Sequence, residues 1–389
     1  MLLLSKHYKK QIPRLEKIKL ILSYKIKERM MASISPDVSS RLKPEVIQVV
    51  KIIYEELCNL QPDQNVLIIS DARTPDYIVA TFQGMALAMG AEAVVIECKI
   101  PKGGATYQPG SKWPSMLEVA ALEADLIIDM AVGYAQFIAA AIKNGARVLC
   151  PGDGIGGAFM DDVLIRTILH TDFHAVRREA DQIAQAFTEA KNCTLITEND
   201  EFNMDISKVE GFAGCGFLWD PDKKDWKSHW EFLPPAQPGI LVPKGIGSGS
   251  INVDGTLLYH PNYHEKPDSP LRLTYEDGYL KEIGGDKLLS SRLETWLENL
   301  GDDSAYYGPV HFNVGCNPNA ALSQSQEWER VYGSLTCGMG DFSMLGELWT
   351  LPEGITLNKS DVHWDWTVLQ PKILLDDKLF ADRGIFYLD

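Results

Sequence analysis

The stretch from residue 65 to residue 100 decides the fold class: it reads NVLIIS (65–70), PDYIVATFQGMALAMG (75–90) and AEAVVIECKI (91–100). The first and last segments are short and rich in β-branched residues, which is typical of buried strands. The middle segment has helical periodicity and ends at Gly90, a common helix terminator. Strand, helix and strand in this order predict a parallel βαβ unit.

The same alternation continues to about residue 192. Two further helices, two further strands and a long closing helix follow: SMLEVAALEA (115–124), DLIIDMA (125–131), AQFIAAAIKN (135–144), ARVLCPG (146–152) and HAVRREADQIAQAFTEA (174–190). Repeated strand–helix alternation predicts a parallel sheet covered by helices. We therefore expect residues 44–192 to form an α/β domain.

The pattern changes after residue 192, where short strands separated by turn residues dominate. The segment TYEDGYLKEI (274–283) places Asp-Gly between two alternating runs, which predicts a hairpin. One helix, KLLSSRLETWLENLG (287–301), interrupts the strands. We expect residues 193–389 to form an α+β domain with a mixed or antiparallel sheet.

Composition and charge exclude several classes of protein. The chain has 389 residues, of which 45% are apolar and 23% charged, and no apolar run reaches the roughly 18 residues that cross a bilayer. A net charge of −16 repels phosphate backbones, so nucleic acid is not an expected partner. The seven cysteines are scattered and form no C-x-x-C pair, which favours a reducing, cytoplasmic location.

The first 30 residues differ from the rest, because they hold nine Lys and Arg residues against only Glu16 and Glu28. They lack the apolar core and cleavage site of a secretory signal. We expect residues 1–43 to be a basic extension, disordered or loosely helical and unrelated to the chemistry. Translation of the natural protein from Met31 is an equally open interpretation.

Two further motifs have ordinary explanations. GDGIGG (152–157) fits the dinucleotide-binding pattern, but it follows the fourth strand rather than the first, so a flexible loop is the better interpretation. Trp219, Trp226 and Trp230 surround His229 in FLWDPDKKDWKSHWEF (217–232). This aromatic patch is either a surface loop or a lid that stacks on an aromatic ligand.

The most informative motif for chemistry is SDVHWDW (360–366). On a strand, residues two apart point to the same face, so His363 and Asp365 project together while Trp364 and Trp366 project to the other face. An imidazole nitrogen and a carboxylate oxygen on one face are a natural pair of metal ligands.

A third ligand must come from elsewhere in the chain. His311, in the β-rich segment GPVHFNVGCNP (308–318), is the best candidate, and His260 and His264 in YHPNYH compete with it. Two histidines and one carboxylate with open positions are the ligand set of non-haem Fe(II) oxygenases. All three residues fall within 193–389, so we expect this α+β domain to be the metal-binding, catalytic one.

Most of the chain, from about residue 65 to residue 380, resembles the 2,5-dihydroxypyridine 5,6-dioxygenase family, which is related to aminopeptidases of the aminopeptidase T type. The order and spacing of several segments carry this resemblance. They are DARTPD (71–76), the Arg-containing helix before CTLITEND (193–200), PLRLTYEDGYLKEIGG (270–285), VHFNVGCNP (310–318), YGSLTCGMG (332–340), SDVHWD (360–365) and LDD (375–377).

The resemblance implies that His311, His363 and Asp365 are the iron ligands. In the aminopeptidase branch a Glu matches His311, another Glu matches Gln237, and a metal-binding His matches Thr336, which disfavours a two-metal peptidase here. The chain also departs from the dioxygenase pattern. A Ser near the iron matches Gly338, and proton-transfer histidines fall near Tyr134 and Asn203.

The function that the resemblance implies is an Fe(II)-dependent, extradiol-type dioxygenase. It would open the ring of a hydroxylated N-heterocycle or hydroxyarene, such as 2,5-dihydroxypyridine, with O₂ as co-substrate, and we expect a homo-oligomer as in its relatives. We expect Tyr134 and His229 to act in catalysis. The expected substrate pocket consists of Gln237, Thr336, Gly338 and Trp364. A Zn- or Mn-dependent metallohydrolase and a non-catalytic binding protein are the alternatives.

Overall fold

The computed structural model describes residues 43–99, 112–133, 135–152, 160–259, 263–322, 327–348, 351 and 353–388. The predicted basic extension lies outside the described residues apart from Lys43, and so do Tyr134, His260 and all of the GDGIGG segment except Gly152. No helix in this described part of the chain is long and apolar enough to cross a bilayer.

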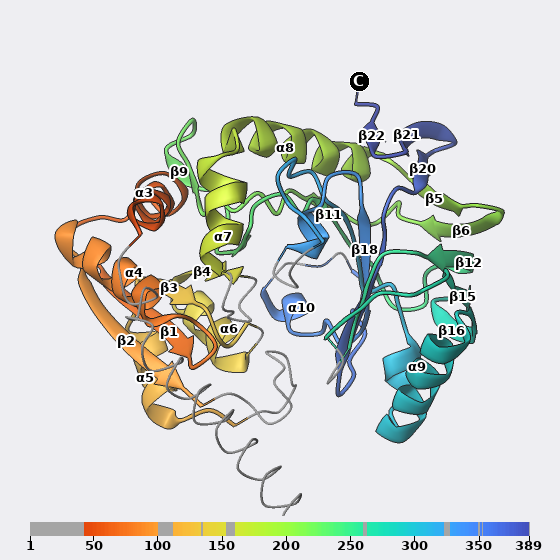
Figure 1. Cartoon of the computed structure of the whole chain (residues 1–389), viewed down its shortest axis with the longest axis horizontal. Coiled ribbons are helices and arrows are strands. Elements are labelled where there is room, and N and C mark those ends of the chain that lie inside the picture. Colours follow the sequence, from red (N-terminus) through yellow and green to blue (C-terminus); the bar gives the residue numbers. More distant parts are fainter. Residues whose placement is uncertain are drawn as a thin grey trace, which may run out of the picture. The chain divides into compact units, whose positions relative to one another are not determined.

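A five-stranded parallel sheet forms from the strand–helix alternation. Its strand order is β10-β4-β3-β1-β2, with β1 (Asn65–Asp71), β2 (Glu92–Cys98), β3 (Leu126–Asp129), β4 (Arg147–Pro151) and β10 (Trp230–Leu233). The apolar runs VLII and LIID lie at its centre, since β1 and β3 pair in the middle of the sheet. Helix α4 follows β1 and packs against β1 and β2, as Figure 1 shows.

Helices surround this sheet and connect its strands. They are α3 (Pro44–Ile52), η2 (Ile53–Leu57), α4 (Asp76–Ala88), α5 (Ser115–Leu122), α6 (Gln136–Lys143), α7 (Met160–Leu164), η4 (Ile165–Leu169) and α8 (Phe173–Glu189). Helix α8 begins where the side chain of Asp172 accepts a hydrogen bond from the backbone N–H of Ala175, 2.9 Å away. It packs against β7 (Gly211–Phe212) and β11 (Gly239–Leu241), which belong to the antiparallel part.

A seven-stranded sheet carries the segments that matter for chemistry. Its strand order is β14-β13-β19-β18-β17-β11-β7, with β7 (Gly211–Phe212), β11 (Gly239–Leu241), β13 (Leu257–Leu258), β14 (Tyr263–Glu265), β17 (His311–Val314), β18 (Leu335–Gly340) and β19 (His363–Val368). Its neighbouring strands pair antiparallel. The central strand β18 is buried along its whole length, because it lies between β17 and β19.

An eight-stranded antiparallel sheet completes the fold. Its order is β16-β15-β12-β6-β5-β20-β21-β22, with β5 (Asn192–Thr197), β6 (Asp200–Asp205), β12 (Ser248–Val253), β15 (Leu271–Glu276), β16 (Tyr279–Gly285), β20 (Lys372–Leu375), β21 (Lys378–Asp382) and β22 (Ile385–Phe386). The predicted hairpin is the β15–β16 pair. Helix α9 (Lys287–Leu300) begins at the capping side chain of Asp286 and ends at Gly301, whose φ of 65° is left-handed.

Short elements connect the sheets: β8 (Trp219–Asp220), β9 (Asp225–Trp226), η5 (Asp303–Tyr306), η6 (Trp328–Arg330) and α10 (Leu345–Leu348). One hydrophobic cluster contains Leu67, Ile69 and Phe137 of the parallel-sheet region together with Phe342 and Leu345. The parallel sheet thus packs directly against the segment that follows β18.

The predicted fold class is confirmed, since a parallel sheet in the first half is followed by antiparallel sheets in the second. One element differs from the expectation. Strand β10, which begins at Trp230, pairs in parallel with β4 and forms the edge of the first sheet. The division at residue 192 remains a prediction, and β10 crosses it.

Candidate metal centre

Three neighbouring strands bring His311, Asp365 and His363 together. In the antiparallel register, His311 of β17 lies opposite Gly338 of β18, and Gly338 lies opposite Asp365 of β19. Residues directly opposite each other share a face of the sheet, and His363 shares that face with Asp365 because it lies two residues earlier on the same strand. Three potential ligands therefore project from one small area.

The glycine in the centre of this area leaves room for both imidazoles as they stand in this chain. A Cβ atom added at Gly338 would lie 2.2 Å from His311 Nε2 and 2.7 Å from His363 Cε1. Both distances are shorter than any ordinary contact between such atoms. The absence of a side chain on the middle strand therefore creates the space between the two imidazoles.

The distances between donor atoms fit a single metal ion. Asp365 Oδ1 lies 3.0 Å from His311 Nε2 and 3.1 Å from His363 Nε2, and one donor atom from each residue lies within 4.8 Å of the others. Donors at right angles on an ion with bonds of about 2.1 Å are separated by about 3 Å. The set of two imidazoles and one carboxylate is the facial triad of mononuclear iron sites.

Hydrogen bonds on the outer side of each imidazole orient it toward the centre. His363 Nδ1 donates to the backbone carbonyl of Asp341 at 2.8 Å, and His311 Nδ1 contacts Asn313 Oδ1. A proton on Nδ1 leaves the Nε2 lone pair directed at the position where a metal would bind.

Electrostatics in the cluster favour a cation. Burial works to lower the pKa of His363, but the charge and hydrogen bond of Asp365 outweigh burial and raise that pKa to about 9. Burial works to raise the pKa of Asp365, but the two histidines hold that pKa well below its usual range. The Asp365 carboxylate thus stays charged, and His363 beside it keeps its proton. A divalent cation can take the place of that proton.

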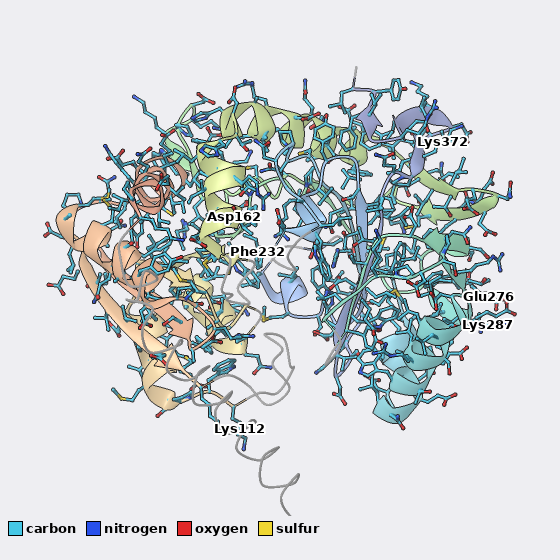
Figure 2. All side chains as sticks on the ribbon, viewed as in Figure 1. Lys112, Asp162, Phe232, Glu276, Lys287 and Lys372 are labelled. Atoms are coloured by element: carbon cyan, nitrogen blue, oxygen red, sulfur yellow. The ribbon has the colours of Figure 1, made fainter. Side chains whose placement is uncertain are left out.

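A cavity of about 650 Å³ reaches this cluster at His311. Its wall contains the aromatic and apolar side chains of Phe342, Trp230, Phe232 (labelled in Figure 2), Leu241 and Leu345. The Phe342 ring stacks on His363, with a centroid distance of 5.2 Å and an interplanar angle of 16°. Charged side chains also line the cavity: Arg177, Asp181, Asp220, Asp222, Lys223 and Lys227.

Two of the predicted pocket residues lie close to the cluster. Gln237 lines the cavity, and its side-chain amide donates to the carboxylate of Glu329. Thr336 lies on the same face of β18 as Gly338, is buried, and its hydroxyl contacts that of Thr367 at 3.1 Å.

Trp364 requires a correction. Alternation along β19 sends it to the face opposite His363 and Asp365, as the strand pattern itself predicts. There it is fully buried, its indole N–H donates to the carbonyl of Ala305 at 2.9 Å, and its ring packs edge-on against Trp296. Trp364 is a core residue and does not line the cavity.

Of the two predicted catalytic residues, only His229 lies in the part of the chain that the structure describes. Tyr134 lies outside the described residues. The side chain of His229 is exposed and is not among the described residues that line the cavity. Its neighbour Trp230 does line the cavity. Strand β10 joins the parallel sheet beside β4, and the Trp230 indole N–H donates to Cys150 Sγ at 3.2 Å.

Sequence reasoning missed three residues, which belong to the cavity wall or to the contacts around His311. Asn313 follows His311 by two positions on the same strand, so the alternation that pairs His363 with Asp365 also predicts it. Glu231 lines the cavity next to Trp230, and Glu329 contacts Asn313 from the short helix η6. Nothing local in the sequence marks either carboxyl group, since both depend on contacts between distant segments.

The fold and the three-residue cluster define a mixed α/β protein with a candidate mononuclear metal centre in an antiparallel sheet. The chain belongs to the 2,5-dihydroxypyridine 5,6-dioxygenase family, whose sequence model matches residues 48–387. The predicted family and the coarser prediction of a dioxygenase are thereby confirmed.

Two solved structures share this fold. The 2,5-dihydroxypyridine dioxygenase from Pseudomonas putida KT2440 is 17% identical, with 88% of this chain and 97% of that chain covered and a TM-score of 0.68. Wild-type AmpT from Thermus thermophilus is 13% identical, with 89% and 100% covered and a TM-score of 0.60. No curated protein matches the sequence.

Proposed function

We propose that the protein is an Fe(II)-dependent dioxygenase that opens the ring of a hydroxylated N-heterocycle or hydroxyarene such as 2,5-dihydroxypyridine. The observation that carries this proposal is the placement of His311, His363 and Asp365 around Gly338, at the end of an aromatic cavity. Family membership supports the substrate class.

His311 Nε2, His363 Nε2 and Asp365 Oδ1 would hold the ion. A bound Fe(II) would supply coordination sites for the substrate hydroxyl and for dioxygen, and the one-electron chemistry that O₂ requires. Asp365 offsets one unit of the ion's charge, and the hydrogen bonds to Asp341 and Asn313 keep both imidazoles facing inward.

The cavity suits a flat aromatic molecule. Trp230 and Phe232 lie with ring centroids 5.2 Å apart, and Phe342 covers both histidines. Such rings bind a planar substrate by stacking and exclude water from the reacting atoms. A volume of about 650 Å³ leaves ample room for a one-ring substrate.

Glu231 is the residue we assign to proton exchange with the substrate. It is buried in the cavity wall, and its Oε2 accepts a hydrogen bond from the backbone N–H of Gly216 at 2.8 Å. Burial raises the pKa of this carboxyl group to about 7, so it gains and loses a proton near neutral pH. Tyr134 stays a second prediction for this role.

Replacing Glu231 by glutamine should change how stability depends on pH. The folded protein raises the pKa of Glu231 from its ordinary value of 4.5 to about 7. The folded state therefore binds more protons than the unfolded state between these values, and stability falls as pH rises through this window. Glu231→Gln removes this pH-dependent decrease in the free energy of unfolding, which is on the order of 3 kcal/mol.

Urea unfolding of both proteins at pH 5 and pH 8 measures the effect. We expect the variant to gain stability relative to the wild type between the two values. An equal change in both proteins would show that Glu231 is not a buried titrating group.

The alternative function is a Zn- or Mn-dependent hydrolase at the same three ligands, and the likeness to AmpT motivates it. In that reaction a metal-activated water would attack an amide, and dioxygen would play no part. Turnover of 2,5-dihydroxypyridine under air but not under nitrogen supports the dioxygenase. Amide hydrolysis that proceeds equally under nitrogen would support the hydrolase. The predicted homo-oligomer is tested by size-exclusion chromatography.

A further inference from the structure

A chain of polar contacts leads from His311 away from the other two ligands. His311 Nδ1 contacts Asn313 Oδ1, and Asn313 Nδ2 donates to Glu329 Oε2 at 2.8 Å. The other oxygen of Glu329 lies 3.9 Å from Arg330 Nη1. Glu329 sits on η6, which packs against β17 and β18.

The hydrogen bonds from His311 to Glu329 have a definite direction, because the Glu329 carboxylate can only accept. A charged carboxylate has no proton to give, so the Asn313 amide must turn its NH₂ group toward Glu329. Its carbonyl oxygen then faces His311, and this oxygen can only accept as well. His311 must therefore carry a proton on Nδ1, so that Nε2, 3.0 Å from Asp365 Oδ1, is the nitrogen that a metal can take in place of a proton.

Burial enforces this direction. Asn313 and Arg330 are fully buried, and the Glu329 side chain is only 12% exposed. In such surroundings a turned amide would place NH₂ against Nδ1 and leave its oxygen against a carboxylate, with little water to compensate. Gln237 also donates to Glu329 Oε2, which agrees with the acceptor role of that oxygen.

We propose that Glu329 is a positioning residue that acts through Asn313 and holds His311 in the tautomer able to bind the metal. This inference rests on the proposed function, because it assumes that His311 is a ligand. Glu329 itself touches neither substrate nor metal in this role.

The first test is Glu329→Leu, which removes the acceptor. The Asn313 amide then loses its orientation, and His311 can shift its proton to Nε2. We expect Zn(II), used as a diamagnetic probe, to bind about 10- to 100-fold more weakly, the usual cost of losing such an outer partner. The matched control is Glu298→Leu, the same change at an exposed glutamate of α9 that does not line the cavity, and it should leave Zn(II) affinity unchanged.

The second test exchanges the donor and the acceptor between positions 313 and 329. Asn313→Asp places two carboxylates against each other and should weaken Zn(II) binding. The double variant Asn313→Asp with Glu329→Gln restores a matched donor and acceptor. Its new amide at position 329 can donate to the new carboxylate at position 313, which still accepts from His311. We expect the double variant to recover most of the affinity that Asn313→Asp loses.

Two measurements decide the matter: Zn(II) titration calorimetry, and ¹⁵N NMR of the histidine rings in the Zn(II)-loaded protein, assigned with a His311→Ala variant. Weaker binding in Glu329→Leu, a proton on His311 Nδ1 in the wild type and recovery in the double variant support the proposal. Wild-type affinity in Glu329→Leu, or no recovery in the double variant, overturns it. The double variant decides if Glu329→Leu fails to fold. A wild-type protein that binds no metal would instead refute the proposed function.

Discussion

Replacing Gly338 by alanine, a change of one methyl group, should abolish tight metal binding. The added Cβ would lie 2.2 Å from His311 Nε2 and 2.7 Å from His363 Cε1. Both imidazoles would have to turn away, and each would lose the hydrogen bond that orients its Nε2. We expect an affinity for Fe(II) or Zn(II) lower by at least about 100-fold, the upper range for disturbing a ligand's support.

The control for this variant is Gly284→Ala in β16. A Cβ added there meets no other heavy atom within 4 Å among the described residues. This variant should bind metal as the wild type does. Metal content is measured by mass spectrometry after dialysis. One tightly bound ion per chain in Gly338→Ala would show that the ion does not sit above this glycine.

The second large effect is expected for His363→Ala, which should purify without bound iron and without dioxygenase activity. His363 is one of two nitrogen donors, and its loss leaves only His311 and Asp365 to hold the ion. Two ligands of a facial set bind Fe(II) far more weakly than three. The fold should be retained, because His363 is the first residue of β19 and the pairing of β19 with β18 is formed by backbone groups.

His174→Ala serves as the comparison, since His174 pairs with Glu56 and is 44% exposed. Circular dichroism of both variants checks the fold, and metal analysis gives the result. Full iron occupancy in His363→Ala would remove this residue from the ligand set.

Much of the fold is predictable because its signals are local. The segment NVLIIS and its helical and stranded neighbours are long enough for their periodicity to identify a parallel sheet, and the Asp-Gly turn identifies the β15–β16 hairpin. Strand β10 is different. Only four residues long, it begins at Trp230 in a charged and aromatic segment, and its partner β4 lies some 80 residues earlier. No local pattern predicts such a pairing.

The candidate ligands also differ in how far a local sequence pattern predicts them. Simple alternation on one strand pairs His363 with Asp365. His311 is only one of three candidate histidines until the family resemblance favours it, because its place beside Asp365 depends on the register across β18. Gly338 stands out in the sequence only as a departure from the family pattern. Its role as the gap between two imidazoles is visible only once three strands are aligned.

The rest of the site depends on contacts that sequence periodicity does not encode. Glu231 and Glu329 reach the cavity and the His311 contacts from segments that read as loops. Nearness in sequence to the ligands suggests Trp364 for the pocket, although adjacent residues on a strand point to opposite faces. The wrong prediction for Trp364 shows that, on a strand, the alternation of side chains decides which residues face a site, and nearness in sequence to the ligands does not.

The most direct test of the central claim is oxygen uptake by anaerobically purified protein reconstituted with Fe(II) and given 2,5-dihydroxypyridine. We predict one bound iron per chain, uptake of one O₂ per substrate consumed, and incorporation of both atoms of ¹⁸O₂ into a ring-opened product. An iron-loaded protein that consumes no oxygen with this or related hydroxyarenes, or one that binds only zinc or manganese and hydrolyses amides, would contradict the account.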